Sequence, residues 1–357
     1  MRVTHEVLHL ALRDPFRIAR KDHVAELGWQ GITTVVIELR DERFPDVVGV
    51  GEGYPDKFYG ETPETMAAVF PYLVSFTEHF TDDLGDPISA RRHLEYVAAN
   101  WEGSLRGHGA AKCALDIALH DFAGKVLGVP VHELIGLSSD IPPTDFTIGI
   151  DEPAVVAERA ARAAQFPALK IKCGGPQDLE TLRAVRAVFD GPIRVDANTG
   201  WTRADAVALL PALVDLGVEL IEQPFPARAY RDLAWLQELS SLPIVADESC
   251  VQLEDLDALV GVVAGVNVKL AKCGGIAPAR EMLERARELG FRTFLGCMEE
   301  TSVGIAGSAA VASLADWVDL DGCLLLADDP FEGLELDADH RWILPPRPGL
   351  GLTRTAA

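Results

Sequence analysis

The most constraining feature of the chain is a strand–helix alternation that runs from Thr144 to Asp321. Helical segments such as 178–189 and 278–290 separate short apolar runs. The runs end near Ile148, Lys172, Asp196, Glu222, Asp247, Lys269, Cys297 and Asp321. Strands that alternate with helices predict a parallel sheet, and eight such units predict an α/β fold with a TIM-like (β/α) barrel.

The residues before this alternation follow a different pattern. Segments 33–39 and 47–55 predict strands, and segment 110–128 has apolar residues at helical spacing up to Gly128. At 357 residues the chain is longer than one ordinary domain. We predict an N-terminal α+β capping domain over 1–135, a barrel catalytic domain over 136–325, and a turn-rich tail over 326–357 that packs back on the capping domain.

Composition narrows the class of partner. The formal net charge of −23 argues against nucleic acid or an anionic membrane. The six cysteines form no CxxC pair, which argues against a zinc motif and a disulfide framework. No apolar run approaches the roughly 18 to 20 residues of a membrane span, and the N-terminus lacks the apolar core of a signal peptide. We expect a cytoplasmic homo-oligomer that acts on a small molecule.

Three carboxylates occupy the same position in successive strand–helix units, at the end of the strand. Asp196, Glu222 and Asp247 each end an apolar run, at intervals of 222−196 = 26 and 247−222 = 25 residues. In a barrel the carboxyl ends of the strands meet at one mouth, so the three side chains would converge from strands three, four and five. Oxygen ligands without His or Cys favour Mg²⁺. The alternative is that each carboxylate only caps the helix that follows it.

Lysines flank this trio. Lys170 and Lys172 are two apart on one strand and face the same side, where each ammonium group would lower the pKa of the other. Lys269 ends a strand four positions further round, half a turn of an eight-stranded barrel. Lys172 and Lys269 would therefore face each other across the mouth and serve as two acid/base groups. Lys272 lies further into the loop, where we expect a surface residue or a helper at the carboxyl-terminal end of the strand.

A second acidic pair, Asp319 and Asp321, ends the last strand of the barrel. Their spacing of two places both on one side, opposite the carboxylate trio. Such a pair offers acceptors to a cationic group such as an α-amino group. Turn capping is the alternative for an isolated DxD.

These residues lie in motifs that resemble a known family over nearly the whole chain. The motifs are PFRIAR (15–20), YGET (59–62), KIK (170–172), DAN (196–198), EQP (222–224), DES (247–249), KLAKCGG (269–275) and GCMEET (296–301). The chain resembles the enolase superfamily, muconate-lactonizing-enzyme subgroup, and most of all its dipeptide epimerases. Enolase-superfamily sites use a Lys or His base together with Mg²⁺ that stabilises an ene-diolate.

The resemblance implies a role for each site residue. Asp196, Glu222 and Asp247 would bind Mg²⁺, and Lys172 and Lys269 would exchange the α-proton of a dipeptide, with Lys170 lowering the pKa of its neighbour. Asp319 and Asp321 would hold the free α-amino group. Further substrate contacts are expected at Thr147, Cys297, Met298 and, from a capping loop over 17–22, Arg20. A second capping loop over 54–60 would close over the site.

One position departs from the family pattern. Glu299 stands where relatives that act on Ala-Glu have an apolar residue, near the side chain of the residue that is epimerised. Our hypothesis is that Glu299 favours a cationic side chain there. The competing hypothesis is an acidic side chain that meets Arg17, Arg20 or Lys21 on the capping loop.

Three other functions would use part of the same residue pattern. An N-succinylamino-acid racemase with o-succinylbenzoate synthase activity, or a cycloisomerase of the same subgroup, would share the lysines and the metal but has no need for Asp319 and Asp321. A Schiff-base lyase would use Lys172 or Lys269 as nucleophile and leaves the carboxylate trio unexplained. A non-catalytic acidic binding protein leaves the two opposed lysines unexplained.

Overall fold

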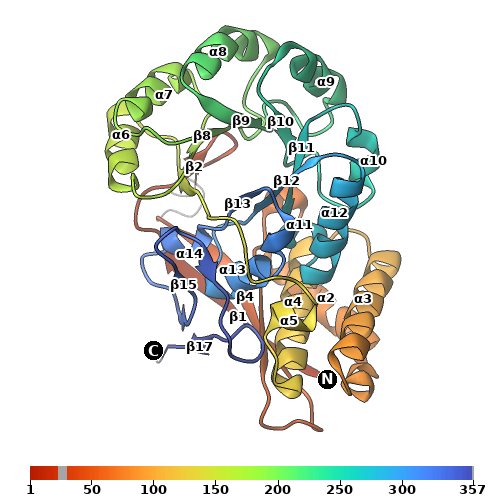
Figure 1. Ribbon diagram of the computed structural model, residues 1–357. Helices are drawn as coiled ribbons and strands as arrows, with labels where there is room; N and C mark the ends of the chain where they lie inside the picture. Colours follow the sequence, from red (N-terminus) through yellow and green to blue (C-terminus); the bar gives the residue numbers. More distant parts are fainter. Residues whose placement is uncertain (23–29, 356–357) are drawn as a thin grey trace.

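A computed structural model describes residues 1–22 and 30–355 of the chain. Its centre is a sheet of eight parallel strands in sequential order, β6 to β13 (Figure 1). A parallel bridge between Thr144 and Val318 joins the segment before β6 to β13, which brings the first and last strands together. The sheet is thus nearly closed into a barrel, and the predicted fold class is confirmed.

Each barrel strand is short and is followed by helical structure that covers its outer side, so that the helices form a ring in Figure 1. The strands are β6 Phe146–Ile148, β7 Leu169–Lys172, β8 Ile193–Asp196, β9 Val218–Glu222, β10 Ile244–Ala246, β11 Gly265–Lys269, β12 Arg292–Gly296 and β13 Trp317–Asp319. The helices are α6 Pro153–Arg162, α7 Asp178–Arg186, α8 Arg203–Asp215, α9 Tyr230–Leu239, α10 Asp255–Leu259, α11 Leu270–Cys273, α12 Ile276–Glu288, α13 Ser302–Ala309, the 3₁₀ helix η4 Ala312–Leu314 and α14 Gly322–Leu325.

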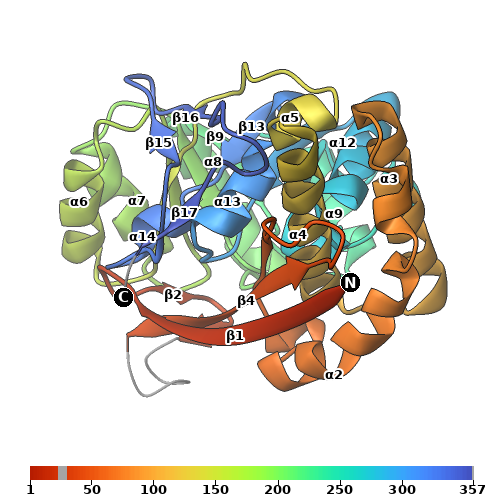
Figure 2. The ribbon, with the colours of Figure 1, turned by 90° about the horizontal axis from the view of Figure 1, so that it is seen from below.

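The N-terminal part pairs an antiparallel sheet with helices. The sheet has the order β1 (Arg2–Ala11), β4 (Gly31–Arg40), β5 (Gly49–Gly53), and it lies along one side of the molecule in Figure 2. A hairpin of β2 (Arg17–Ile18) and β3 (Lys21–Asp22) lies between β1 and β4 in the sequence. The helices are α2 Pro63–Val74, α3 Pro87–Ser104, α4 Gly109–Leu127 and α5 Val131–Leu134, with the 3₁₀ helices η1 Lys57–Tyr59, η2 Ser75–Thr77 and η3 Phe80–Asp83.

Helix α4 is buried along most of its length because strand β5 lies directly against it. The glycines of β5 make this approach possible: a Cβ atom added at Gly51 would lie 1.9 Å from the carbonyl oxygen of Ala114. Gly49 and Gly53 meet carbonyl oxygens of α4 at 2.3 and 2.1 Å in the same way. Only glycine has no Cβ to clash at this distance. The left-handed Gly128 (φ 72°) ends the helix where the sequence predicts.

Two buried carboxylates of the N-terminal part tie it to the barrel. Glu52 of β5 accepts hydrogen bonds from the backbone N–H groups of Thr301 and Gly304 at the start of α13, at 3.0 to 3.1 Å. Asp116 of α4 accepts from the N–H of Ile276 at the start of α12. Carboxylates at helix N-termini satisfy donors that the helix itself leaves free. The mouth of the barrel is therefore fixed relative to the sheet above it.

The C-terminal tail returns to the N-terminal part through short paired strands. These are β14 Phe331–Glu332 with β17 Thr353–Arg354, and β15 Glu335–Leu336 with β16 Trp342–Ile343. The N–H of Leu350 donates to Asp121 of α4 at 2.8 Å, and Val131 N–H donates to the carbonyl of Gly349 at 3.0 Å. Within the described residues, no helix is both long enough and apolar enough to cross a membrane.

Candidate active site

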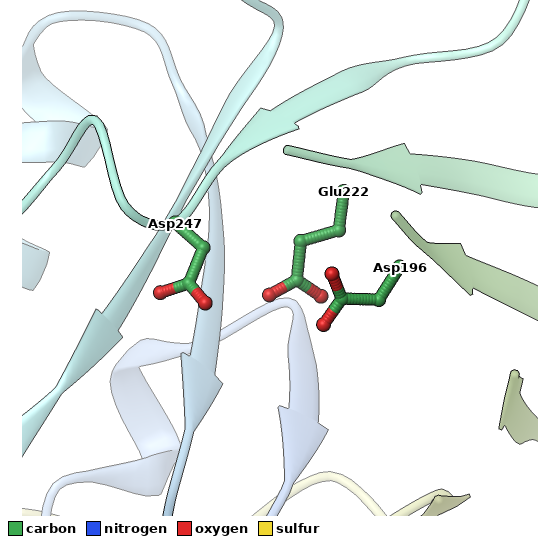
Figure 3. Close-up of side chains that lie close together, drawn as sticks. All are labelled: Asp196, Glu222 and Asp247. Atoms are coloured by element: carbon green, nitrogen blue, oxygen red, sulfur yellow. The ribbon is translucent and has the colours of Figure 1, made fainter. Parts of the chain in front are cut away.

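The carboxylates of Asp196, Glu222 and Asp247 come together at the mouth of the barrel (Figure 3). Asp196 and Glu222 end β8 and β9, and Asp247 directly follows β10. One oxygen from each lies within 4.8 Å of the others, and all three side chains are buried. Three carboxylates from adjacent parallel strands thus point at one spot, as their spacing in the sequence predicts.

The electrostatics of the trio suit a divalent cation. Burial, together with the charge of Asp196, raises the pKa of Glu222 to about 7. The pKa of Asp247 stays well below its ordinary value, because Lys269 and Lys272 outweigh its burial. Beside the trio, Asn198 Oδ1 and Glu248 Oε2 are buried without a hydrogen-bond partner among the described residues. An all-oxygen set with spare acceptors is the ligand chemistry of Mg²⁺, so these residues fit that ion.

Lys172 and Lys269 lie on opposite strands of the barrel and each bonds one carboxylate of the trio. Lys172 Nζ donates to Asp196 Oδ2 at 2.6 Å, and Lys269 Nζ donates to Asp247 Oδ2 at 2.8 Å. Their strands, β7 and β11, are four apart in the eight-stranded order. Burial lowers the pKa of Lys269, but the charges of Asp247, Glu222 and Asp196 together outweigh it and hold the pKa above its ordinary value.

Lys170 differs from the sequence expectation in one respect. Its ammonium group lies 2.7 Å from Glu222 and from Asp319 and 3.3 Å from Asp196. Burial alone would lower the pKa of Lys170, but these three carboxylates hold it well above the ordinary value. The expected mutual lowering between Lys170 and Lys172 is therefore wrong for Lys170, whose main neighbours are anions and not the second ammonium group.

Of the two placements expected for Lys272, the surface position is wrong. Lys272 is buried, not on the surface, and its ammonium group donates to Asp247 Oδ1 at 2.6 Å and to the carbonyl oxygens of Asp247, Cys250 and Asn267. Lys272 lies in the short helix α11, which directly follows β11. It bonds the carboxylate oxygen of Asp247 that Lys269 does not bond, and so helps to fix the position of Asp247.

Asp319 and Asp321 lie on the other arc of the mouth, where Thr147 joins them. Asp319 Oδ1 accepts from Thr147 Oγ1 at 3.1 Å, and Asp321 Oδ2 accepts from the backbone N–H of Thr147 at 2.6 Å. Both carboxyl groups are buried. Burial and the neighbouring Asp319 raise the pKa of Asp321 well above its ordinary value. Lys170 balances the charge of Asp319 at 2.7 Å, whereas Asp321 forms no ion pair among the described residues.

One cavity connects these groups. It is lined by both opposed lysines and by every substrate-contacting residue that the resemblance implies. The residues are Phe16, Ile18, Arg20, Asp56, Thr147, Lys172, Asn198, Lys269, Cys297, Met298, Glu299, Asp319, Asp321 and Leu325. The capping segments 16–20 and 56 therefore close the mouth from above, as expected for the loops near 17–22 and 54–60.

The two candidates for specificity, Arg20 and Glu299, are both in contact with other groups. Arg20 lies 3.4 Å from Asp56 and 3.3 Å from Glu248, and its guanidinium group stacks over the ring of Phe58 at 4.2 Å. Glu299 accepts a hydrogen bond from the buried Tyr54 hydroxyl. The side chain of Lys21 lies outside the part of the chain that the structure describes.

The family model described as "Mandelate racemase / muconate lactonizing enzyme, N-terminal domain" matches residues 9–136, and "Enolase C-terminal domain-like" matches residues 154–356. The chain belongs to the mandelate racemase/muconate lactonizing enzyme family. This confirms the resemblance to the enolase superfamily.

Members of this family with known activities and structures align along its whole length. The L-Ala-D/L-Glu epimerase of Bacteroides thetaiotaomicron is 36% identical over 99% of this chain and 88% of its own. The dipeptide epimerase of Enterococcus faecalis V583, in complex with Mg and L-Leu-L-Tyr, has a TM-score of 0.83 at 31% identity, with 99% of both chains covered. The dipeptide epimerase of Methylococcus capsulatus, in complex with Mg and L-Arg-D-Lys, has a TM-score of 0.82 at 33% identity, with 98% of both chains covered. The expected enzyme class, an isomerase of the epimerase type, is confirmed.

Within this family framework, sequence reasoning missed several residues inside the barrel. Asn267 donates to Glu222 Oε1 at 2.7 Å, and Arg194 bonds Asp145 at 2.8 Å. A signal for both was present: Asn267 and Arg194 each lie two residues before a predicted site residue and so face the same side of their strands. The side-chain amide of Gln223, which holds the backbone N–H groups of Asp247 and Ser249, carried no such signal.

Proposed function

We propose that the chain is a Mg²⁺-dependent epimerase that inverts the α-carbon of the C-terminal residue of a dipeptide. The proton would pass between Lys172 and Lys269 through an enolate. The observation that carries this proposal is the single cavity that both lysines, Asp319 and Asp321 line together. Proton-transfer groups and acceptors for an amine thus reach the same small molecule.

Asp196, Glu222 and Asp247 would hold the metal. When bound there, Mg²⁺ supplies the positive charge that a substrate carboxylate and its enolate need. The Mg in the related Enterococcus and Methylococcus structures supports this assignment. Asp247 is bonded by Lys269 and Lys272, so its position is fixed before a ligand arrives.

The two lysines would transfer the proton on opposite faces of the substrate α-carbon. Lys172 on β7 removes the α-proton from one epimer, and Lys269 on β11 protonates the other face of the α-carbon. Asp196 and Asp247 orient the two ammonium groups at 2.6 and 2.8 Å. A base on each side explains inversion in both directions, because each lysine acts as base for one epimer and as acid for the other.

Asp319 and Asp321 support a dipeptide over an N-acylated amino acid. Both are buried, and among the described residues only one lysine, Lys170, reaches the pair, through Asp319. A free α-amino group would supply the missing cation, whereas an N-succinyl group would bring a further negative charge to two carboxyl groups. The dipeptides in the related complexes agree with this choice.

We further propose a cationic side chain on the residue that is epimerised. Arg20 already meets Asp56 and Glu248, so two carboxylates neutralise it before an acidic substrate could. Glu299 lines the cavity, and a carboxylate that accepts from Tyr54 keeps lone pairs for a second donor. The L-Arg-D-Lys in the complex of the Methylococcus dipeptide epimerase is a ligand of this kind in one relative.

A dipeptide library incubated in D₂O with Mg²⁺ tests the proposal. We expect deuterium at the α-carbon of the C-terminal residue, fastest for Lys and Arg, and none after chelation of the metal. A parallel set of N-succinylamino acids is the matched control. Faster exchange in that set, or metal-independent turnover that borohydride traps on a lysine, would contradict the proposal in favour of the racemase or the Schiff-base lyase.

Three broader expectations stay predictions. They are the division into 1–135, 136–325 and 326–357, a homo-oligomeric state and a cytoplasmic location. All six cysteines are free thiols in the structure, which agrees with a reducing compartment.

A further inference from the structure

Asp145 is a buried carboxyl group without a role in the proton transfer proposed above. It directly precedes β6, and its backbone N–H donates to the carbonyl oxygen of Val318 on β13 at 3.1 Å. Its side chain is 0% exposed, and its Oδ2 accepts from Arg194 Nη1 at 2.8 Å. Asp145 lies two residues before Thr147, so both side chains face the barrel interior.

The carboxyl groups of Asp145 and Asp319 are in hydrogen-bonding contact. Two carboxylate oxygens can form such a bond only when one of them carries a proton. No donor from the described residues reaches Asp145 Oδ1, which makes this oxygen the place for the proton. A buried carboxylic acid that donates satisfies both groups, whereas two adjacent carboxylates would leave an oxygen unpaired and repel each other.

Asp319 is the partner that carries the charge. Its Oδ2 accepts from Lys170 Nζ at 2.7 Å and its Oδ1 from Thr147 Oγ1 at 3.1 Å. Burial raises the pKa of Asp319, but Lys170, the hydrogen bond with Asp145 and Lys172 together outweigh it and keep the pKa below the ordinary value. For Asp145, burial and the charge of Asp319 raise the pKa well above the ordinary value, and Arg194 only opposes this in part.

We propose that Asp145 is a positioning residue that donates its carboxyl proton to Asp319 and so fixes the carboxylate that receives the substrate amine. A carboxylate has about four acceptor sites. Lys170, Thr147 and Asp145 would fill three of those on Asp319. Asp321, whose carboxyl group is also in hydrogen-bonding contact with Asp319, would share the fourth with the cavity that both aspartates line. The identity of the amine rests on the proposed dipeptide function, whereas the proton on Asp145 does not.

Infrared spectroscopy tests the proton without any substrate. The experiment subtracts the spectrum of the Asp145→Asn variant from that of the wild type, both as Mg²⁺-loaded full chains at neutral pH. We expect the variant to lose a band of a protonated carboxyl C=O group. A difference spectrum with carboxylate bands alone would overturn the proposal, whatever the enzyme turns over.

Kinetics test the positioning role. In Asp145→Asn the amide group donates to Asp319 and its oxygen accepts from Arg194, so we expect KM for a dipeptide within about threefold of the wild type. Asp145→Leu removes the donor, and we expect KM to rise about tenfold or more, with kcat changed less.

Equal losses in the Asn and Leu variants would overturn the proposal, because they would identify Asp145 as the ionised partner of Arg194. Thermal unfolding shows whether the Leu variant is folded. If the wild type epimerises no dipeptide, the proposed function fails, and the infrared result still decides the state of Asp145.

Discussion

The two carboxylate clusters at the mouth of the barrel differ in how their charge is balanced. In the metal cluster of Asp196, Glu222 and Asp247, every carboxylate has a lysine nitrogen within 3.3 Å. In the part of the chain that the structure describes, the amine cluster of Asp319 and Asp321 has one such nitrogen, that of Lys170, and it forms an ion pair with Asp319 alone.

This difference indicates which cluster is already formed before a ligand binds and which one still lacks a cation. The metal cluster is held in shape by fixed cations, so its geometry exists before a ligand binds. In the amine cluster, Asp321 accepts a hydrogen bond from the backbone N–H of Thr147. Burial raises the pKa of Asp321, which disfavours its charged form. A cation from the substrate would complete this cluster. Under the proposed function, the arc with many lysines would carry out the proton transfer, and the arc with one lysine would select the substrate.

The largest effect should come from the lysines that serve the metal cluster. Lys172→Ala and Lys269→Ala should each lower the epimerisation rate by about 10³-fold, within the range that acid/base groups contribute. Exchange of the α-proton with D₂O, measured by NMR from each epimer separately, should survive for one epimer in Lys172→Ala and for the other in Lys269→Ala. Epimerisation near the wild-type rate in either folded variant would break the assignment of the two bases.

The next effect sharpens the role of the amine cluster. Asp319→Asn and Asp321→Asn should raise KM for dipeptides by roughly 10- to 100-fold, because each removes a charge-assisted hydrogen bond to the α-amino group. N-acetylated dipeptides, which lack that charge, are the control substrate and should lose far less. Equal losses for both substrates would mean that the pair supports the barrel wall and does not recognise the amine.

The sequence predicts these two clusters unequally well. The eight strand ends and the trio could be predicted, because parallel strands place residues in equal phase at one edge. Lys272 could not, since its burial depends on the turn of α11 after β11 and not on any periodic pattern. The pKa of Lys170 was predicted in the wrong direction because its neighbour in the sequence, Lys172, was easier to see than the carboxylates of Asp319 and Glu222 that reach it across the barrel.

Lys272 offers a test of the claim that fixed cations shape the metal cluster. Lys272→Met should weaken Mg²⁺ binding about tenfold, as measured by isothermal titration calorimetry, because Asp247 loses one of the bonds that fix its position. Lys125→Met is the matched control: Lys125 also bonds a buried aspartate, Asp121, but far from the mouth, on α4. Unchanged Mg²⁺ affinity in Lys272→Met would show that the trio keeps its shape without this lysine.

The smallest effect concerns Glu299, which belongs to neither cluster. Glu299→Gln keeps the shape and removes the charge, so the ratio of kcat/KM for L-Ala-L-Lys over L-Ala-L-Met should fall by about three- to fivefold, the size expected of one partly exposed ion pair. Asp56→Asn is the companion variant. It takes one of two carboxylates from Arg20 and should therefore raise activity on L-Ala-L-Glu instead. If Glu299→Gln leaves the ratio unchanged while Asp56→Asn shifts it, selection of the side chain belongs to Arg20 on the capping segment and not to the end of β12.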